Sequence, residues 1–110
     1  MQVTQERFED AGERDANGDY DYHYSGVIYR CVFPSRVLVA RRHDDTIGEA
    51  SFLRSESLTD GTAAMFTEIP YRDPEFREAV SFLRKSEGVE FVQVLLSRGY
   101  VRIDFTELAA

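Results

Sequence analysis

The stretch that decides the fold is residues 73–96, DPEFREAVSFLRKSEGVEFVQVLL. Asp73 is a good helix N-cap, Pro74 suits the first helical position, and Gly88 follows two basic residues as a stop signal. The apolar side chains between them recur at helical spacing and form one stripe, made of Phe76, Ala79, Val80, Phe82 and Leu83. The sequence therefore predicts an amphipathic helix that packs on a sheet.

The same stretch ends in an almost continuously apolar run, residues 89–96. Such a run is typical of a strand that is buried on both faces, so we expect it to lie in the centre of the sheet. A turn at 97–99 follows, and Val101, Ile103 and Phe105 then alternate with polar residues. This alternation predicts a last strand with one face in water.

The segments that precede the helix show further strand signals. Residues 20–33 are rich in tyrosine and β-branched residues and predict a long strand, in which Gly26 indicates a bulge where the two faces switch. Residues 37–42 and 49–54 predict two more strands, and the three together indicate an antiparallel meander. Residues 63–69 favour a strand only weakly over a short helix.

These elements predict one α+β fold. We expect a mainly antiparallel sheet of five or six strands with one long helix packed on a face, in the order βββ(β)αββ. The chain has 110 residues and is 43% hydrophobic, which fits a single domain with one core.

Residues 1–19 differ in composition from the rest of the chain. They are polar and carry most of the net charge of −7, so we expect an acidic, flexible N-terminal arm before a single domain at 20–110. An acidic protein is repelled by phosphate backbones, so we expect no nucleic-acid partner.

The sequence also indicates a compartment. No apolar run approaches the length of a membrane helix, and no basic-then-apolar leader opens the chain, so we expect a cytoplasmic protein that does not bind membranes. Cys31 is the only cysteine and cannot form an intrachain disulfide. We interpret it as a small core residue.

Motifs that carry chemistry are missing from the sequence. It has no phosphate loop, dinucleotide fingerprint, nucleophile elbow or paired cysteines. Asp15, Asn17, Asp19 and Asp21 alternate as in a calcium loop, but the sixth position is Tyr20 rather than glycine and the twelfth is not glutamate. We therefore predict no metal, no cofactor and no catalytic residues, and we favour a protein that is not an enzyme over a modest enzyme.

Tyrosines on the first predicted strand form one candidate binding surface: Tyr20, Tyr22, Tyr24 and Tyr29. Such amphipathic aromatic side chains either recognise a partner or pair across strands within the sheet. The leading hypothesis is a small non-enzymatic interaction or accessory protein that binds a protein partner or a second copy of itself. A related hypothesis is that the acidic arm occupies a basic groove on another protein.

A second candidate site lies around the second hairpin and belongs to a different class of function. It consists of Arg41, Arg42, His43, Glu49 and Arg54. These groups suit a domain that binds a small anionic ligand, or a modest enzyme with His43 or Glu49 as acid or base. Strand alternation already points Arg41 and Arg42 to opposite faces, so the hypothesis requires the other side chains to converge.

Overall fold

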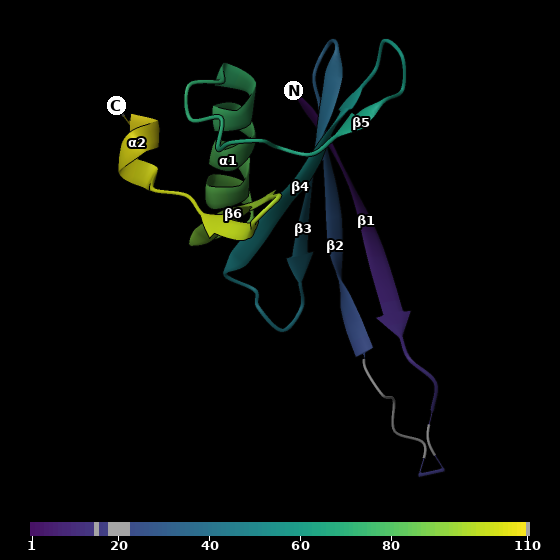
Figure 1. The fold of residues 1–110 in the computed structure, drawn as a ribbon. Helices are drawn as coiled ribbons and strands as arrows, with labels where there is room; N and C mark the ends of the chain where they lie inside the picture. The colour runs from purple at the N-terminus through teal and green to yellow at the C-terminus, as the bar shows by residue number, and fades with distance from the viewer. Residues whose placement is uncertain (15, 18–22, 110) are drawn as a thin grey trace.

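The computed structural model of the protein describes residues 1–14, 16–17 and 23–109, and it shows one twisted sheet with two helices on one side (Figure 1). The described elements are β1 (Gln2–Ala11), β2 (His23–Val32), β3 (Arg36–His43), β4 (Glu49–Ser57), β5 (Ala63–Ala64), α1 (Pro74–Ser86), β6 (Phe91–Leu96), β7 (Gly99–Arg102) and α2 (Phe105–Ala109). The α+β class, the mostly antiparallel sheet and the packed helix are confirmed.

The strand order is β1-β2-β3-β4-β6-β7, and β5 pairs with β4 beside this path. Strands β1 to β4 form an antiparallel meander. Strands β4 and β6 are parallel, with Phe52 beside Val94. A parallel pair needs a long crossover, and α1 lies within the segment that makes it. The run predicted at 89–96 is accordingly an inner strand.

The N-terminal segment differs from the acidic arm expected from its composition. Residues Gln2–Ala11 form β1, which pairs with β2 along its whole length. The segment buries too little apolar surface to become ordered alone, but the edge of β2 offers it a complete ladder of backbone hydrogen bonds. Val3 also packs against the core. Of the predicted arm, residues 15 and 18–19 lie outside the described residues, as do Tyr20 and Tyr22.

Gly26 does not mark a bulge, since the β1–β2 register runs through it without a shift. The register shift lies instead between Val39 and Ala40, where β3 pairs with β4. A Cβ on Gly26 would stand 2.0 Å from the carbonyl oxygen of Arg42 and 2.8 Å from Cε1 of Phe8. Glycine is therefore needed here because two neighbours approach the backbone closely.

The last predicted strand is only partly correct. Strand β7 ends at Arg102, and Phe105 begins the short helix α2. Asp104 favours this helix, because its Oδ1 accepts hydrogen bonds from Thr106 N at 2.9 Å and Thr106 Oγ1 at 2.6 Å. Alternation over so few residues did not distinguish a strand end from one helical turn. Of the strand weakly predicted at 63–69, the structure forms only the two-residue strand β5, Ala63–Ala64.

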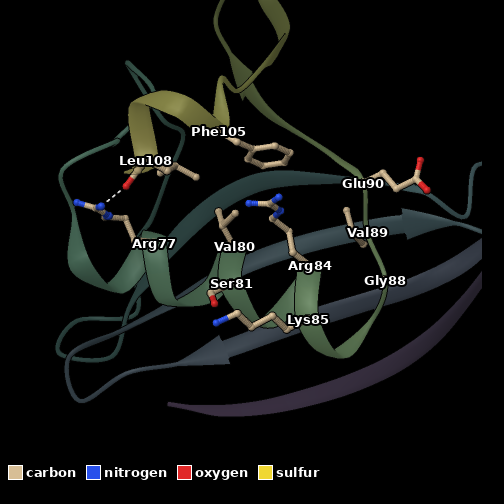
Figure 2. A pocket seen from close by; sticks show the side chains of 10 residues that line it. All are labelled: Arg77, Val80, Ser81, Arg84, Lys85, Gly88, Val89, Glu90, Phe105 and Leu108. Atoms are coloured by element: carbon tan, nitrogen blue, oxygen red, sulfur yellow. Dashed lines mark hydrogen bonds between the residues drawn. The ribbon is translucent and has the colours of Figure 1, made fainter. Parts of the chain in front are cut away.

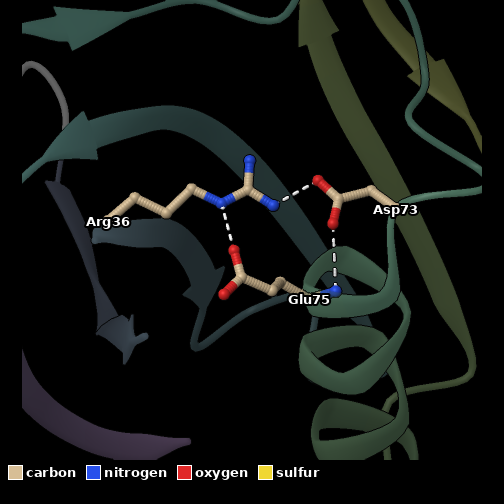
Figure 3. A network of polar contacts seen from close by, with 3 residues as sticks. All are labelled: Arg36, Asp73 and Glu75. Atoms are coloured by element: carbon tan, nitrogen blue, oxygen red, sulfur yellow. Dashed lines mark hydrogen bonds and ion pairs between the residues drawn. The ribbon is translucent and has the colours of Figure 1, made fainter. Parts of the chain in front are cut away.

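The predicted helix is confirmed as α1. It buries Phe76, Ala79, Val80 and Leu83 against the sheet. The Phe76 ring lies 4.9 Å from that of Phe52, measured between centroids. At its start, Asp73 Oδ1 accepts from Glu75 N at 3.0 Å, and Arg36 of β3 binds both the Asp73 and Glu75 carboxylates (Figure 3). Charge pairs thus fix the helix start to the sheet.

Candidate functional site

The face of the sheet opposite α1 is the first candidate surface, and we call it the open face. Tyr29 and Phe52 point to α1, as their ring contacts with Phe82 and Phe76 show. Side chains alternate along a strand, so their neighbours in sequence point away from the helices. The cross-strand registers then assign these residues to the open face: Thr4, Glu6, Phe8, Asp10, Tyr24, Ile28, Arg30, Val39, Arg41, His43, Ser51, Arg54, Glu56, Gln93, Leu95, Tyr100 and Arg102, with Glu49 and Phe91 at one end.

One carboxylate links two arginines on the open face. Glu56 Oε1 lies 2.7 Å from Arg30 Nη2, and Glu56 Oε2 lies 2.8 Å from Arg54 Nε. Hydrogen bonds from both guanidiniums lower the pKa of the Glu56 carboxyl. Val39, on the same face, has no exposed surface. The aliphatic parts of the Arg30 and Arg54 side chains can therefore cover Val39 while their guanidinium groups stay near water.

A second set of contacts crosses the open face between strands that are distant in sequence. Arg41 Nη2 of β3 donates to the Tyr100 hydroxyl of β7 at 2.8 Å. Gln93 Nε2 of β6 donates to the buried Ser51 hydroxyl of β4 at 2.8 Å. These bonds hold the polar side chains of four strands in one layer.

At the β7 edge the layer ends in exposed aromatic and charged groups. Arg102 lies over the Phe91 ring, 4.3 Å from its centroid, and 3.6 Å from the Glu49 carboxylate. Phe91 is 44% exposed and Tyr100 46% exposed. Two aromatic rings and an arginine thus face solvent together.

The part of the open face formed by strands β2–β7 is locally positive in an acidic chain. On strands β2–β7 its described residues include four arginines and two glutamates, and β1 adds Glu6 and Asp10, whereas the whole chain has a net charge of −7. This part of the face therefore differs in sign from the chain as a whole.

The structure separates the residues of the predicted 41–54 site. Arg41, Glu49 and Arg54 lie on the open face. Arg42 lies on the helix side, where its Nη1 donates to the Glu87 carbonyl at 3.3 Å and its guanidinium sits 5.8 Å from the Tyr29 ring centroid. His43 lies between the rings of Phe8 and Tyr24, with centroid distances of 5.7 and 5.9 Å. The β2–β3 register places His43 on the open face as well, so only Arg42 lies on the other side of the sheet from the rest of the predicted site.

The tyrosines of the predicted recognition strand are also separated. Tyr29 is completely buried on the helix side, while Tyr24 is half exposed and, by alternation, points to the other face. Tyr20 and Tyr22 lie outside the described residues. The aromatic surface that the structure does show, Phe91 with Tyr100, was missed because only the β6–β7 register places these rings on the same side as Arg41.

Cys31 is a buried core residue, as predicted. Burial, with a smaller contribution from the Glu78 charge, raises the pKa of its thiol to about 11. A thiol in that state is a poor nucleophile near neutral pH.

The second candidate surface is a groove of about 740 Å³ between α1 and α2 (Figure 2). Its basic residues, Arg77, Arg84 and Lys85, come from one side of α1, and Phe105 and Leu108 of α2 form the opposite wall. None of the described residues of the two predicted sites lines this groove. In the sequence, the basic residues of the groove lie on the polar side of the predicted helix. That side has the composition of any solvent-facing helix surface, so it did not indicate a binding site.

Within the described part of the chain, no cluster of three or more histidine, cysteine or acidic side chains is arranged to hold a metal ion. Residues 15, 19 and 21 of the calcium-like pattern lie outside that part. None of the described helices is both long and apolar enough to cross a bilayer. Comparison of the chain with protein-family models, curated proteins and solved structures gives no significant match.

Proposed function

We propose that this protein is a non-enzymatic interaction module that binds an acidic surface of another protein through the β2–β7 part of the open face of its sheet. The observation that carries the proposal is the set of exposed rings and arginines at the β7 edge, Phe91, Tyr100 and Arg102. Aromatic residues and arginine are the side chains most enriched at the centres of protein interfaces.

The layer is suited to binding because it is ordered before a partner arrives. The Arg41–Tyr100 hydrogen bond and the stacking of Arg102 on Phe91 restrict these side chains already in the free protein. Side chains that are held in place lose less conformational entropy on binding.

The charge of this surface favours a different protein, rather than a second copy of this chain, as the binding partner. In a symmetric dimer the same patch meets itself, so pairing the β2–β7 part of two open faces would bring eight arginines together with four glutamates. Like charges facing each other oppose association. An acidic surface on another protein avoids this repulsion, and we expect its binding to weaken as salt is added.

The test combines capture with two variants of the open face. Full-length wild type, Tyr100→Ala and Arg102→Glu are immobilised and exposed to extract of the cells that produce the protein. Arg72→Glu is the matched control, because Arg72 is exposed in the loop before α1 and lies outside the open face. Every captured protein that depends on the face is purified and titrated against all four proteins by calorimetry.

The proposal predicts a protein that wild type and Arg72→Glu retain and the two face variants lose, with affinity reduced about tenfold or more. Tyr100→Phe keeps the ring and serves as a second variant if Tyr100→Ala does not fold. Capture that is independent of the face, or no capture, overturns the proposal. So does a dimer in light scattering that Arg102→Glu dissociates, or binding of a poly(dT) oligonucleotide that Arg102→Glu abolishes.

A further inference from the structure

The groove between α1 and α2 lies outside the open face and has a different composition. Arg77, Ser81, Arg84 and Lys85 share one side of α1, since they are spaced by about one helical turn or two. Opposite them α2 places Phe105 and Leu108 (Figure 2). The groove therefore has a cationic side and an apolar side.

The charge balance of the groove favours an anion. Arg77, Arg84 and Lys85 line it, and Glu90 is the only acidic side chain among its described lining residues. Figure 2 shows Glu90 at the far end of the groove from Arg77. Positive charges concentrated in a concave site raise the local concentration of anions, even on a protein that is acidic as a whole.

Two of the cations are already held in place. The Arg84 guanidinium stacks on the Phe105 ring, 3.8 Å from its centroid. Stacking uses the face of the guanidinium and leaves its in-plane N–H donors available to a carboxylate or phosphate. Arg77 donates from Nη2 to the carbonyl of Leu108, which fixes the position of its remaining donors (Figure 2).

The apolar side adds a second requirement for the ligand. Val80 and Val89 join Phe105 and Leu108 in lining the groove, so part of any occupant meets hydrocarbon. Binding sites for small molecules commonly combine such apolar walls with a few placed charges. From the cations, the fixed guanidiniums and the apolar wall, we infer that this groove binds small organic anions that carry a carboxylate or phosphate next to an apolar group.

A purely structural role for the same residues makes a different prediction. Arg84 and Lys85 also lie in the last turn of α1, where cations stabilise the helix end, and Arg77 and Arg84 hold α2. In that role they contribute to the free energy of unfolding and give no affinity for an anion. Ligand titration distinguishes the two roles because it measures affinity rather than stability.

The experiment is a two-dimensional NMR titration of the full-length protein with four probes. Phenyl phosphate and phenylacetate carry both an anionic head and a ring, inorganic phosphate carries only the anion, and benzyl alcohol carries only the ring. We expect shifts at α1 and α2 with both aromatic anions, and affinity for them at least about fivefold above that for either partial probe.

Variants assign the binding to the groove. Lys85→Gln and Arg84→Gln each weaken phenyl phosphate binding about fivefold, and Arg84→Lys also weakens it because it keeps the charge but loses the planar fork. Arg98→Gln is the control, since it removes the same charge from an exposed turn outside the groove and leaves binding unchanged. The spectrum of each variant without ligand shows whether it is folded.

Several results overturn the inference. These are the absence of shifts at α1 and α2, benzyl alcohol binding as tightly as phenyl phosphate, and unchanged binding in the Arg84 and Lys85 variants. An equal loss in Arg98→Gln indicates diffuse attraction by surface charge, and it also rejects the site. None of these outcomes bears on the open face, whose partner is tested separately.

Discussion

Arg36, the first residue of β3, donates through Nη2 to the carboxylate of Asp73, the residue that caps α1, and through Nε to Glu75 at 2.6 Å. One side chain thereby connects the sheet to the start of the helix that covers it (Figure 3). Asp73 serves two roles, because its other oxygen accepts from Glu75 N.

The two roles of Asp73 are separable by substitution. Asp73→Asn keeps a good N-cap but loses the charge pair, whereas Asp73→Ala loses both. We expect Asp73→Ala to lower the free energy of unfolding by about 1 kcal/mol more than Asp73→Asn does. Arg36→Met is expected to cost about 1–2 kcal/mol. Urea unfolding measures all three, and equal losses for Asn and Ala at position 73 would contradict the double role.

The same contact has a defined pH dependence. Burial raises the pKa of the Asp73 carboxyl, but hydrogen bonding and charge attraction from Arg36, with the N–H groups of the helix start, lower it overall. A carboxyl whose pKa is lower in the folded state contributes stability above its unfolded pKa of about 3.9, and that stability is lost as pH falls through the folded value. The stability difference between wild type and Arg36→Met should therefore shrink on acidification below about pH 4. A constant difference down to about pH 2 would refute this.

Gly26 is expected to tolerate no side chain. In Gly26→Ala the new Cβ would meet the backbone carbonyl of Arg42, which cannot move without disturbing β3, so we expect a loss of about 1–3 kcal/mol. Gly48→Ala is the matched control, because the nearest atom to its Cβ is a glutamate side-chain oxygen at 3.9 Å. Thermal unfolding should separate the two variants clearly, and similar melting temperatures would disprove the close approach.

Tyr29 should make the protein sensitive to alkali. Burial, opposed by the Arg42 charge and reinforced by Glu87, raises the pKa of Tyr29 to about 12. A group whose pKa is raised on folding contributes stability below its unfolded pKa of about 10, and that contribution is lost between about pH 10 and 12. Wild type should lose more stability than Tyr29→Phe between pH 9 and 11, and equal losses would exclude Tyr29 as the cause.

The thiol of Cys31 should be unreactive in the folded protein. It is fully buried, and the pKa of its thiol is raised to about 11 by burial. Ellman's reagent at mildly alkaline pH should modify it slowly in native buffer and rapidly after denaturation. Fast modification of the native protein, at a rate unrelated to unfolding, would contradict the burial of this strand.

Local chemistry made much of the fold predictable. The N-cap at Asp73, the stripe from Phe76 to Leu83 and the glycine stop at Gly88 define α1 without reference to the rest of the chain. The meander was predictable for a similar reason, since alternation and turn residues act between neighbours in sequence. Helix α2 was not predicted. Asp104 indicates a helix cap, but the alternation of Val101, Ile103 and Phe105 with polar residues indicated a strand instead.

Features that depend on distant pairing were not predictable. The segment containing Val3 and Phe8 becomes β1 only because β2 offers it an edge. The open face requires Arg41 of β3 and Tyr100 of β7 to meet across β4 and β6, which no local pattern encodes. The groove likewise requires α2 to return to α1, and the contacts that hold it there span Arg77 and Leu108.

The parallel pairing of β4 with β6 implies an order of assembly. The meander strands contact their neighbours in sequence, so their hairpins close short loops, whereas Phe52 and Val94 meet only after the intervening segment with α1 has been brought back. We expect the meander amides to gain protection first in pulsed hydrogen exchange during refolding, and the β6 amides last. Until then residues 49–52 of β4 present an unpaired edge while β3 already covers the other side of the strand. The refolding chain therefore passes through a stage in which a β6 strand from another molecule can pair with this edge.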